Sequence, residues 1–282
     1  MSMRPLVLYH DNCPDGFGSA WAAWLNYGDE ADYRAVNYGQ EPPDVTGREV
    51  YILDFSYPRK TLLRMKREAA GMCVLDHHKT AQADLEGLEF CEFDMNRSGA
   101  TMAWDYLISP VRLPEEERWR QEPEIVRQNL VTRRFVEYLT DRDLWRFALP
   151  QSREVSAALW SYPRTFEAWT DCAQNIDRLK QEGVAILRFK NALVEQMCAQ
   201  SAWVTIEGHK VPFVNASVCF SEVGEALCHK FPDAPFAAYY FDRGDGRRQW
   251  GARSQGFDVS AVAKALGGGG HTQAAGWTED IP

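Results

Sequence analysis

The sequence lacks several features that would each identify a broad class of protein. Within its 282 residues, no apolar run approaches the roughly 18 residues that a membrane-spanning helix needs. The seven cysteines form no Cys-x-x-Cys pair, which argues against a structural zinc site and a disulfide framework and predicts reduced thiols. The first residues carry neither a basic segment nor a cleavable apolar stretch, so we expect a cytoplasmic protein with no membrane partner.

Basic residues are also in deficit. The chain has 31 Lys and Arg against 40 Asp and Glu, a net charge of −9, so long duplex nucleic acid is not expected to bind through bulk electrostatics. A phosphate-bearing ligand would need a local cation, either an arginine cluster or a bound metal. The apolar fraction of 45% excludes disorder and supports a sizeable core, in one large domain or two modest ones.

Short β-rich runs alternate with helical stretches in the first 80 residues, a pattern typical of a parallel sheet with crossover helices. Helical character from 166 to 200 is long, and a break near Gly183 or a role as a connector would account for it. We therefore predict an α/β protein in which an N-terminal parallel-sheet domain with flanking helices precedes a smaller C-terminal mixed β/α domain. The expected boundaries are 1–185, a helical connector at 186–201, and 202–282.

Metal-ligand residue types follow three of the predicted strands. His10 follows 6–9, Asp54 follows 50–53, and Asp76-His77-His78 follows 72–75. Ligands of open parallel sheets bind at the carboxyl ends of the strands, so these side chains can converge. Asp15, just before a predicted helix, is either a helix cap or a further ligand. Such a mixed set suits Mn²⁺, Mg²⁺, Fe²⁺ or Zn²⁺, and it exceeds the need of one ion.

A glycine run near the end of the chain is the second candidate site. Gly267–Gly270 precedes His271, and the absence of a following Gly-Lys-Ser/Thr disfavours a P-loop. The backbone N–H groups of Gly268, Gly269 and Gly270 can approach an anion, with His271 as a side-chain donor. The alternative is a flexible hinge or a helix C-cap. Arg253, shortly before the run, is a candidate for bidentate phosphate binding.

These motifs together resemble the DHH phosphoesterase family. The resemblance rests on HDNCPDG from His10, on VYILD ending at Asp54, on VLDHH ending at His78 and on GGGGHTQAAG from Gly267. It runs from residue 10 to residue 276, essentially the whole chain. It implies a dinuclear Mn²⁺-type site in the N-terminal domain, a smaller substrate-binding domain, and an active site in the cleft between them.

The resemblance also implies roles for individual residues. The implied metal ligands are His10, Asp15, Asp54, Asp76, His77 and Asp141. His10 and Asp15 would bind the first ion, Asp54 would bridge, and His77 would bind the second ion. His78 would contact the scissile phosphate as a catalytic residue, and Asp76 would assist it as ligand or support. Asp143 is the alternative to Asp141 in the segment TDRDLWR.

Two positions carry open alternatives. Arg97, in a segment that resembles a family helix start, is either a substrate contact or a solvated arginine. Phe17 stands where many members carry a second Asp, so Asp11 or Asn12 substitutes, water fills the place, or only one ion binds tightly.

The expected activity is divalent-metal-dependent hydrolysis of phosphodiester or phosphomonoester bonds in short oligonucleotides or nucleotides, with one or two Mn²⁺ ions or another divalent metal such as Mg²⁺. The alternatives are an exopolyphosphatase, which would hydrolyse phosphoanhydrides in polyphosphate, and a catalytically silent nucleotide-binding protein. A homodimer is compatible with the sequence.

Overall fold

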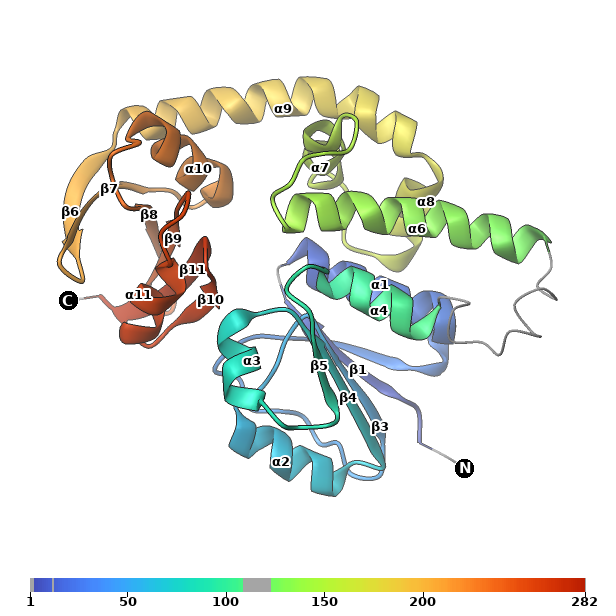
Figure 1. Ribbon diagram of the computed structural model, residues 1–282. Coiled ribbons are helices and arrows are strands. Elements are labelled where there is room, and N and C mark those ends of the chain that lie inside the picture. Colours follow the sequence, from blue (N-terminus) through green and yellow to red (C-terminus); the bar gives the residue numbers. More distant parts are fainter. Residues whose placement is uncertain (1–2, 12, 109–122, 282) are drawn as a thin grey trace. The chain divides into compact units, whose positions relative to one another are not determined.

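The computed structural model describes residues 3–11, 13–108 and 123–281, with the backbone alone for 123–128. The chain divides between Ile186 and Leu187 into two compact units, which are described separately below (Figure 1). All seven cysteines carry free thiols. No helix in the described ranges combines the length and the apolar character that a bilayer crossing requires.

The N-terminal unit is built on a five-stranded sheet in the order β2-β1-β3-β4-β5, with every neighbouring pair parallel. Its strands are β1 (Leu6–His10), β2 (Asp32–Val36), β3 (Glu49–Leu53), β4 (Gly71–Asp76) and β5 (Cys91–Phe93). The strand order reverses between β1 and β3, and in sheets of this kind ligands bind at that switch point. Tyr9 pairs with Leu53 and Leu53 with Leu75, so the residues that follow these three leave the sheet at one level.

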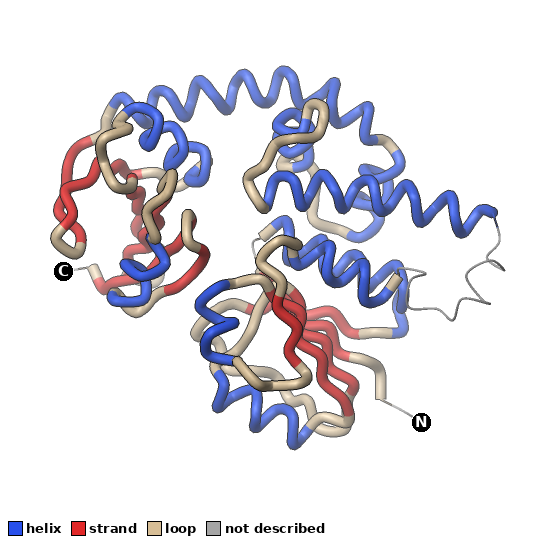
Figure 2. Tube along the Cα trace, in the orientation of Figure 1, coloured by secondary structure: helices blue, strands red, loops and turns tan. Residues whose placement is uncertain are grey.

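Helices cover both faces of this sheet (Figures 1 and 2). On one face lie α1 (Pro14–Tyr27) and α4 (Gly99–Leu107), and on the other lie α2 (Arg59–Glu68) and α3 (Lys79–Leu85). Side chains alternate along the strands, so Val7 and Leu53 enter the first apolar cluster while Leu8 and Ile52 enter the second.

A further helical layer packs on α1 and α4. It consists of α6 (Pro123–Asp143) and α8 (Phe166–Gln174), and α7 (Ser152–Leu159) packs on α6. Fully buried Trp169 of α8 joins this layer to the core through edge-on contacts with Phe17 and Phe135.

The long helical stretch breaks at Asn175, between α8 and α9 (Ile176–Ala199), so a break near Gly183, one of the two explanations considered, is wrong. Gly183 lies inside α9, where a Cβ would come within 2.0 Å of the Glu154 carbonyl oxygen. This glycine therefore serves close packing of α9 on α7 and does not end the helix.

The C-terminal unit is a six-stranded mixed sheet in the order β10-β11-β9-β8-β7-β6. Its elements are β6 (Ala202–Ile206), β7 (His209–Asn215), α10 (Phe220–Lys230), β8 (Ala237–Asp242), β9 (Arg247–Arg253), α11 (Val259–Ala265), β10 (Gly269–His271) and β11 (Ala274–Asp280). The pair β7·β8 is parallel and the other pairs are antiparallel. The predicted fold class, a parallel-sheet α/β unit followed by a smaller mixed β/α unit, is confirmed.

Candidate metal centre

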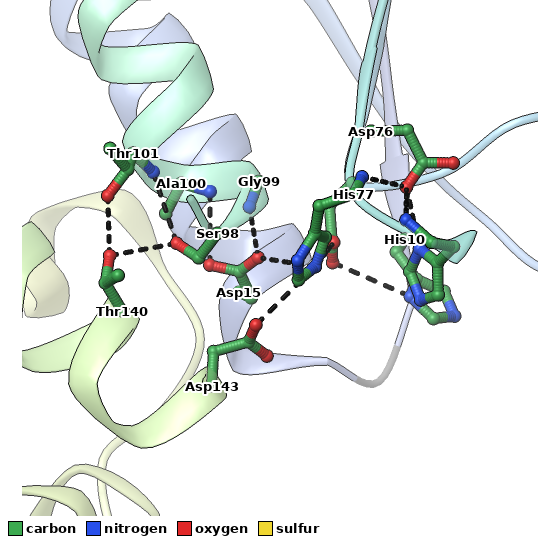
Figure 3. Close-up of polar contacts among 12 residues, drawn as sticks. His10, Asp15, Asp76, His77, Ser98, Gly99, Ala100, Thr101, Thr140 and Asp143 are labelled. Carbon is green, nitrogen blue, oxygen red and sulfur yellow. Dashed lines mark hydrogen bonds and ion pairs between the residues drawn. The ribbon is translucent and has the colours of Figure 1, made fainter. Parts of the chain in front are cut away.

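Five polar side chains from separate elements meet at the carboxyl edge of the parallel sheet (Figure 3). They come from the ends of β1, β3 and β4, from the first turn of α1, and from the last residue of α6. The five are His10, Asp54, His77, Asp15 and Asp143. His78 lies beside them as the residue after His77.

His77 is the centre of a first group of ligand atoms. Its Nε2 lies 3.1 Å from Asp54 Oδ1, 3.6 Å from Asp15 Oδ2 and 3.5 Å from Asp143 Oδ2. His77, Asp15 and Asp54 are at most 2% exposed. Three carboxylates thus surround one buried imidazole, and two of them, those of Asp15 and Asp54, are buried with it.

Asp54 also belongs to a second group, with His10 and His78, whose ligand atoms all lie within 4.8 Å of one another. Asp54 Oδ2 and His10 Nδ1 face each other at 3.6 Å. Both atoms are buried, and neither has a hydrogen-bond partner among the described residues. The carboxylate of Asp54 therefore links two adjacent groups, one at each oxygen.

Two glycines make this convergence possible. Asp54 leaves β3 with φ of +56°, and a Cβ on Gly99 would lie 2.4 Å from the Asp54 Cβ. A Cβ on Gly16 would lie 2.3 Å from the His10 carbonyl oxygen. Only glycine at these positions lets the first turns of α4 and α1 approach the strand ends so closely.

Asp15 is held by the N-terminus of α4. Its two carboxylate oxygens accept hydrogen bonds from the backbone N–H of Gly99, at 2.6 Å, and of Ala100, at 3.1 Å. The N-cap Ser98 in turn accepts from Thr101 N–H. Asp15 sits in the first turn of α1, but no side-chain cap bond is made there, so its partner is a different helix from the one that the sequence suggested.

Asp76 supports the site from behind. Its Oδ1 lies 2.6 Å from His78 Nδ1 and accepts the His77 N–H at 2.8 Å, while Ser56 Oγ donates to its Oδ2 at 2.9 Å. A fully buried carboxylate with these partners orients His78. Of the two roles left open for Asp76, ligand or support, this geometry favours support.

Burial and charge act against each other at these groups. Burial opposes protonation of His77, but Asp143, Asp54 and Asp15 outweigh it and raise the pKa of His77 to about 11. Burial, followed by the charges of Asp143 and Asp54, raises the pKa of Asp15 well above its ordinary value. For Asp54 burial is outweighed by His10 and His77, which hold its pKa well below the usual range. Without a bound cation, the cluster therefore retains protons, which reduce the repulsion among its carboxylates.

These residues fit a divalent cation. With ligand bonds of about 2.1 Å, two ligands on one ion lie about 3.0 Å apart at right angles and about 4.2 Å apart when opposite. The distances of 3.1–3.6 Å around His77 and between His10 and Asp54 fall in that range. The buried unpartnered atoms of His10 and Asp54 are what an ion would satisfy. The predicted pairing changes, however, because Asp15 groups with His77 and His10 groups with His78.

The candidate metal ligand from α6 also differs from the expected one. Asp141 was the expected ligand, but its carboxylate accepts the backbone N–H of Ala148 at 2.9 Å and of Leu149 at 3.0 Å. Asp143, the predicted alternative, is the carboxylate beside His77. Asp141 instead holds the turn after α6, in which Trp145 and Phe147 adopt positive φ.

Phe17, in place of an expected second carboxylate, is a core residue. It is 6% exposed and stacks on Phe166 at 5.3 Å between ring centroids. Of the two substitutes considered, Asn12 lies outside the described residues, and Asp11 is absent from the groups of candidate ligands found among the described ones. The extra carboxylate beside His77 comes from Asp143.

Arg97 is engaged by acids of its own unit. Its guanidinium nitrogens lie 2.8 Å from Glu92, 2.8 Å from Asp94 and 3.3 Å from Asp105. Asp105 also pairs with Arg133 at 2.7 Å. This network favours neither of the predicted roles, substrate contact or solvated arginine, and indicates a structural one.

The glycine run combines a helix cap and a strand. Gly267 N–H donates to Lys264 O and Gly268 N–H donates to Ala263 O, the pair of bonds that closes a Schellman cap on α11. Gly269–His271 then forms β10, which pairs with β11. The Gly268 amide is therefore committed to the cap and is unavailable to the predicted anion cradle, while Gly269, Gly270 and His271 lie on the strand.

Arg253 ends β9 in the same unit. Its Nη2 donates to Ser221 Oγ at 2.6 Å, and its side chain packs on Gly224, where a Cβ would lie 2.5 Å from Arg253 Cγ. This arrangement holds the guanidinium against α10.

This fold, a doubly wound parallel-sheet unit followed by a small mixed-sheet unit, is shared with solved structures of DHH-family proteins. The RecJ structure of Thermus thermophilus in complex with Mn²⁺ superposes with a TM-score of 0.53 at 15% identity, over 99% of this chain and 50% of that one. The DHH domain of a protein described as a member of a ribosomal-protein family superposes with a TM-score of 0.51 at 12% identity, over 99% and 83% of the two chains. At such identities the likeness establishes the fold.

Sequence comparison adds one relative of unassigned role. The uncharacterized protein R106 of Acanthamoeba polyphaga mimivirus is 25% identical over 298 aligned residues, covering 96% of this chain. The chain spans 66% of that viral protein's length. No protein-family model matches the chain.

Proposed function

We propose that this protein is a divalent-metal-dependent phosphoesterase that hydrolyses short oligonucleotides or nucleotides. One observation carries the proposal: the buried carboxylate of Asp54 links two acid-imidazole groups at the switch point of a parallel sheet. Two adjacent cation positions that share a carboxylate, about 3.5 to 4 Å apart, are the arrangement by which phosphoryl-transfer hydrolases act.

Divalent metal use is supported by two features. The donor set contains only carboxylate and imidazole, which suits a divalent cation such as Mn²⁺, Mg²⁺, Fe²⁺ or Zn²⁺. The RecJ structure that shares the fold was determined in complex with Mn²⁺. When bound, a divalent cation polarises a phosphoryl oxygen and lowers the pKa of water toward neutrality.

The chain's own residues would hold and orient the reacting groups. Asp15, Asp54, His77 and Asp143 would form one cation position, and His10 and Asp54 would contribute to the other. Asp76 orients His78 through Nδ1, and the His78 ring would contact a phosphate oxygen of the substrate. The charge of Asp76 outweighs the effect of burial and raises the pKa of His78, so the ring can donate a proton to a negatively charged group.

Short substrates fit the chain better than long ones. The net charge of −9 gives no general attraction for a polyanion, so affinity must come from the cation positions and the few groups around them. Polyphosphate hydrolysis is the second candidate, because the same cluster can act on a phosphoanhydride. The motive for a silent binding protein, the loss of a carboxylate at Phe17, is weakened by the position of Asp143.

A substrate panel with Mn²⁺ tests the proposal. Mononucleotide release from dinucleotides supports it, orthophosphate release from polyphosphate supports the second candidate, and nucleotide binding without turnover contradicts both. Asp54→Asn and His77→Ala should reduce hydrolysis by at least about 100-fold while the protein stays folded. Exposed Asp233 and His229 supply the matched controls, Asp233→Asn and His229→Ala, which should retain full activity.

A further inference from the structure

Tyr38 is an exposed aromatic residue in contact with the histidines of the metal centre. Its ring centroid lies 5.4 Å from that of His10 and 6.3 Å from that of His78, nearly perpendicular to both. Its relative exposure is 54%, whereas Phe55 and Tyr57, its neighbours in the same aromatic row, are 1% and 4% exposed. The core thus ends in an aromatic ring that leaves half of its surface in water beside the site.

The backbone around Tyr38 is defined by a tight turn. The Gln40 N–H donates to the Asn37 carbonyl at 3.2 Å, and the Gln40 side chain accepts from Asn37 N–H at 2.9 Å. Gly39 has φ of +83°, the sign that the third residue of a type II turn requires. This turn directly follows β2 and presents the ring at the edge of the sheet where His10 ends β1.

The ring also rests on a rigid support. Tyr38 contacts Phe55 at 4.8 Å, and Phe55 contacts Tyr57 at 4.9 Å. Phe55 belongs to the apolar cluster beneath the sheet. A supported ring loses little conformational entropy when a planar group stacks on its exposed side.

We propose that Tyr38 is the stacking residue for the nucleobase next to the scissile phosphate, which makes it a specificity residue. This inference rests on the proposed function and deepens it from phosphoesters in general to esters that carry an aromatic base. One sugar separates a base from its phosphate, so a phosphate held beside His10 and His78 brings its base to the ring of Tyr38. Stacking does not distinguish strongly among bases, so broad base tolerance is expected.

The test compares a 5′-phosphorylated diadenylate with the same dinucleotide lacking both bases, in Mn²⁺. Tyr38→Ala should lower the ratio of kcat/KM for the two substrates about ten-fold, and Tyr38→Phe should preserve it because the ring remains. Trp160→Ala removes a comparably exposed ring, 51% exposed, from the same unit and should leave the ratio unchanged. An unchanged ratio for Tyr38→Ala, or an equal loss on both substrates, overturns the assignment.

A binding measurement separates this inference from the proposed function. Titration with non-hydrolysable methylenephosphonate versions of both dinucleotides, with Mn²⁺ present, needs no turnover. If the wild-type protein hydrolyses neither substrate, the proposed function fails. The assignment of Tyr38 then survives only if Tyr38→Ala weakens the base-bearing ligand about ten-fold more than the abasic one.

Discussion

The clearest prediction concerns two acids at the end of α6 that lie two residues apart and perform different tasks. Asp141 stabilises the turn after the helix, and Asp143 faces His77. Replacing Asp141 with Ala removes the charged acceptor of the Ala148 and Leu149 amide hydrogen bonds, at a cost of about 2–4 kcal/mol in the free energy of unfolding. For a unit of this size that corresponds to a Tm lower by about 5–15 °C.

Asp143→Asn should have the opposite profile. Its carboxylate is one of three around His77, and burial, outweighing the attraction of His77, raises its pKa, so removing the charge relieves repulsion in the metal-free protein. Its Tm without metal should therefore equal or exceed that of the wild type. Loss of a ligand should weaken Mn²⁺ binding by at least about 100-fold.

Calorimetric Mn²⁺ titration and thermal unfolding of the same two variants make the test, with Asp233→Asn as the exposed control. The reasoning is refuted if Asp141→Ala loses Mn²⁺ binding with an unchanged Tm while Asp143→Asn binds the metal normally. Folded Asp141→Ala at low temperature should still bind Mn²⁺, because the carboxylate itself does not reach the cluster.

Three further predictions follow from the site. A pKa of about 11 keeps His77 protonated at neutral pH without metal, whereas metal ligation requires the neutral ring. Mn²⁺ binding should therefore release a proton, and Mn²⁺ affinity should rise as pH rises toward that pKa. Calorimetric titrations in buffers of different ionisation enthalpy would detect the released proton, and binding without proton release would contradict the prediction. Gly99→Ala places a Cβ against Asp54 and should cost about 1–3 kcal/mol of stability together with metal affinity. Gly244→Ala, which meets open space, is its control in the same unfolding and binding assays. In the wild type the charge of Asp76 outweighs the effect of burial and raises the pKa of His78. Asp76→Asn removes that charge, so the imidazole resonance of His78 should titrate at lower pH in the metal-free protein. An unchanged titration of His78 would reject the Asp76–His78 pairing.

Much of the N-terminal unit could be predicted because its signals are local. Apolar β-forming runs that end in His10, Asp54 and Asp76 specify strands followed by polar termini, and alternation with helices specifies parallel pairing. Parallel pairing then brings the termini to one edge without further information. The short strand β5 and helix α7 were missed, because three residues and eight residues carry little periodicity.

The glycines show where local reasoning ends. Gly183 resembled a helix break and proved to be a contact with the backbone of α7, while Gly99 carried no signal beyond its place in a helix start. Glycine is required at these positions because a segment distant in sequence lies where a Cβ would be. A run such as Gly267–Gly270 likewise permits a cradle, a hinge or a cap, and hydrogen bonds to the carbonyls of Ala263 and Lys264 make Gly267 and Gly268 a helix cap.

The sequence by itself determined that β1, β3 and β4 form, where their polar ends lie, and that acids and imidazoles meet at one edge of a parallel sheet. Only the tertiary structure decided how those groups divide, with Asp15 beside His77 and His10 beside His78. The tertiary structure also places the carboxylate of Asp143, and not that of Asp141, beside His77. Two residues turn a helix by about 200°, so the packing of α6 determines which of the two faces the cluster. Residue type and spacing are local properties, whereas the direction of a side chain depends on every element packed around it.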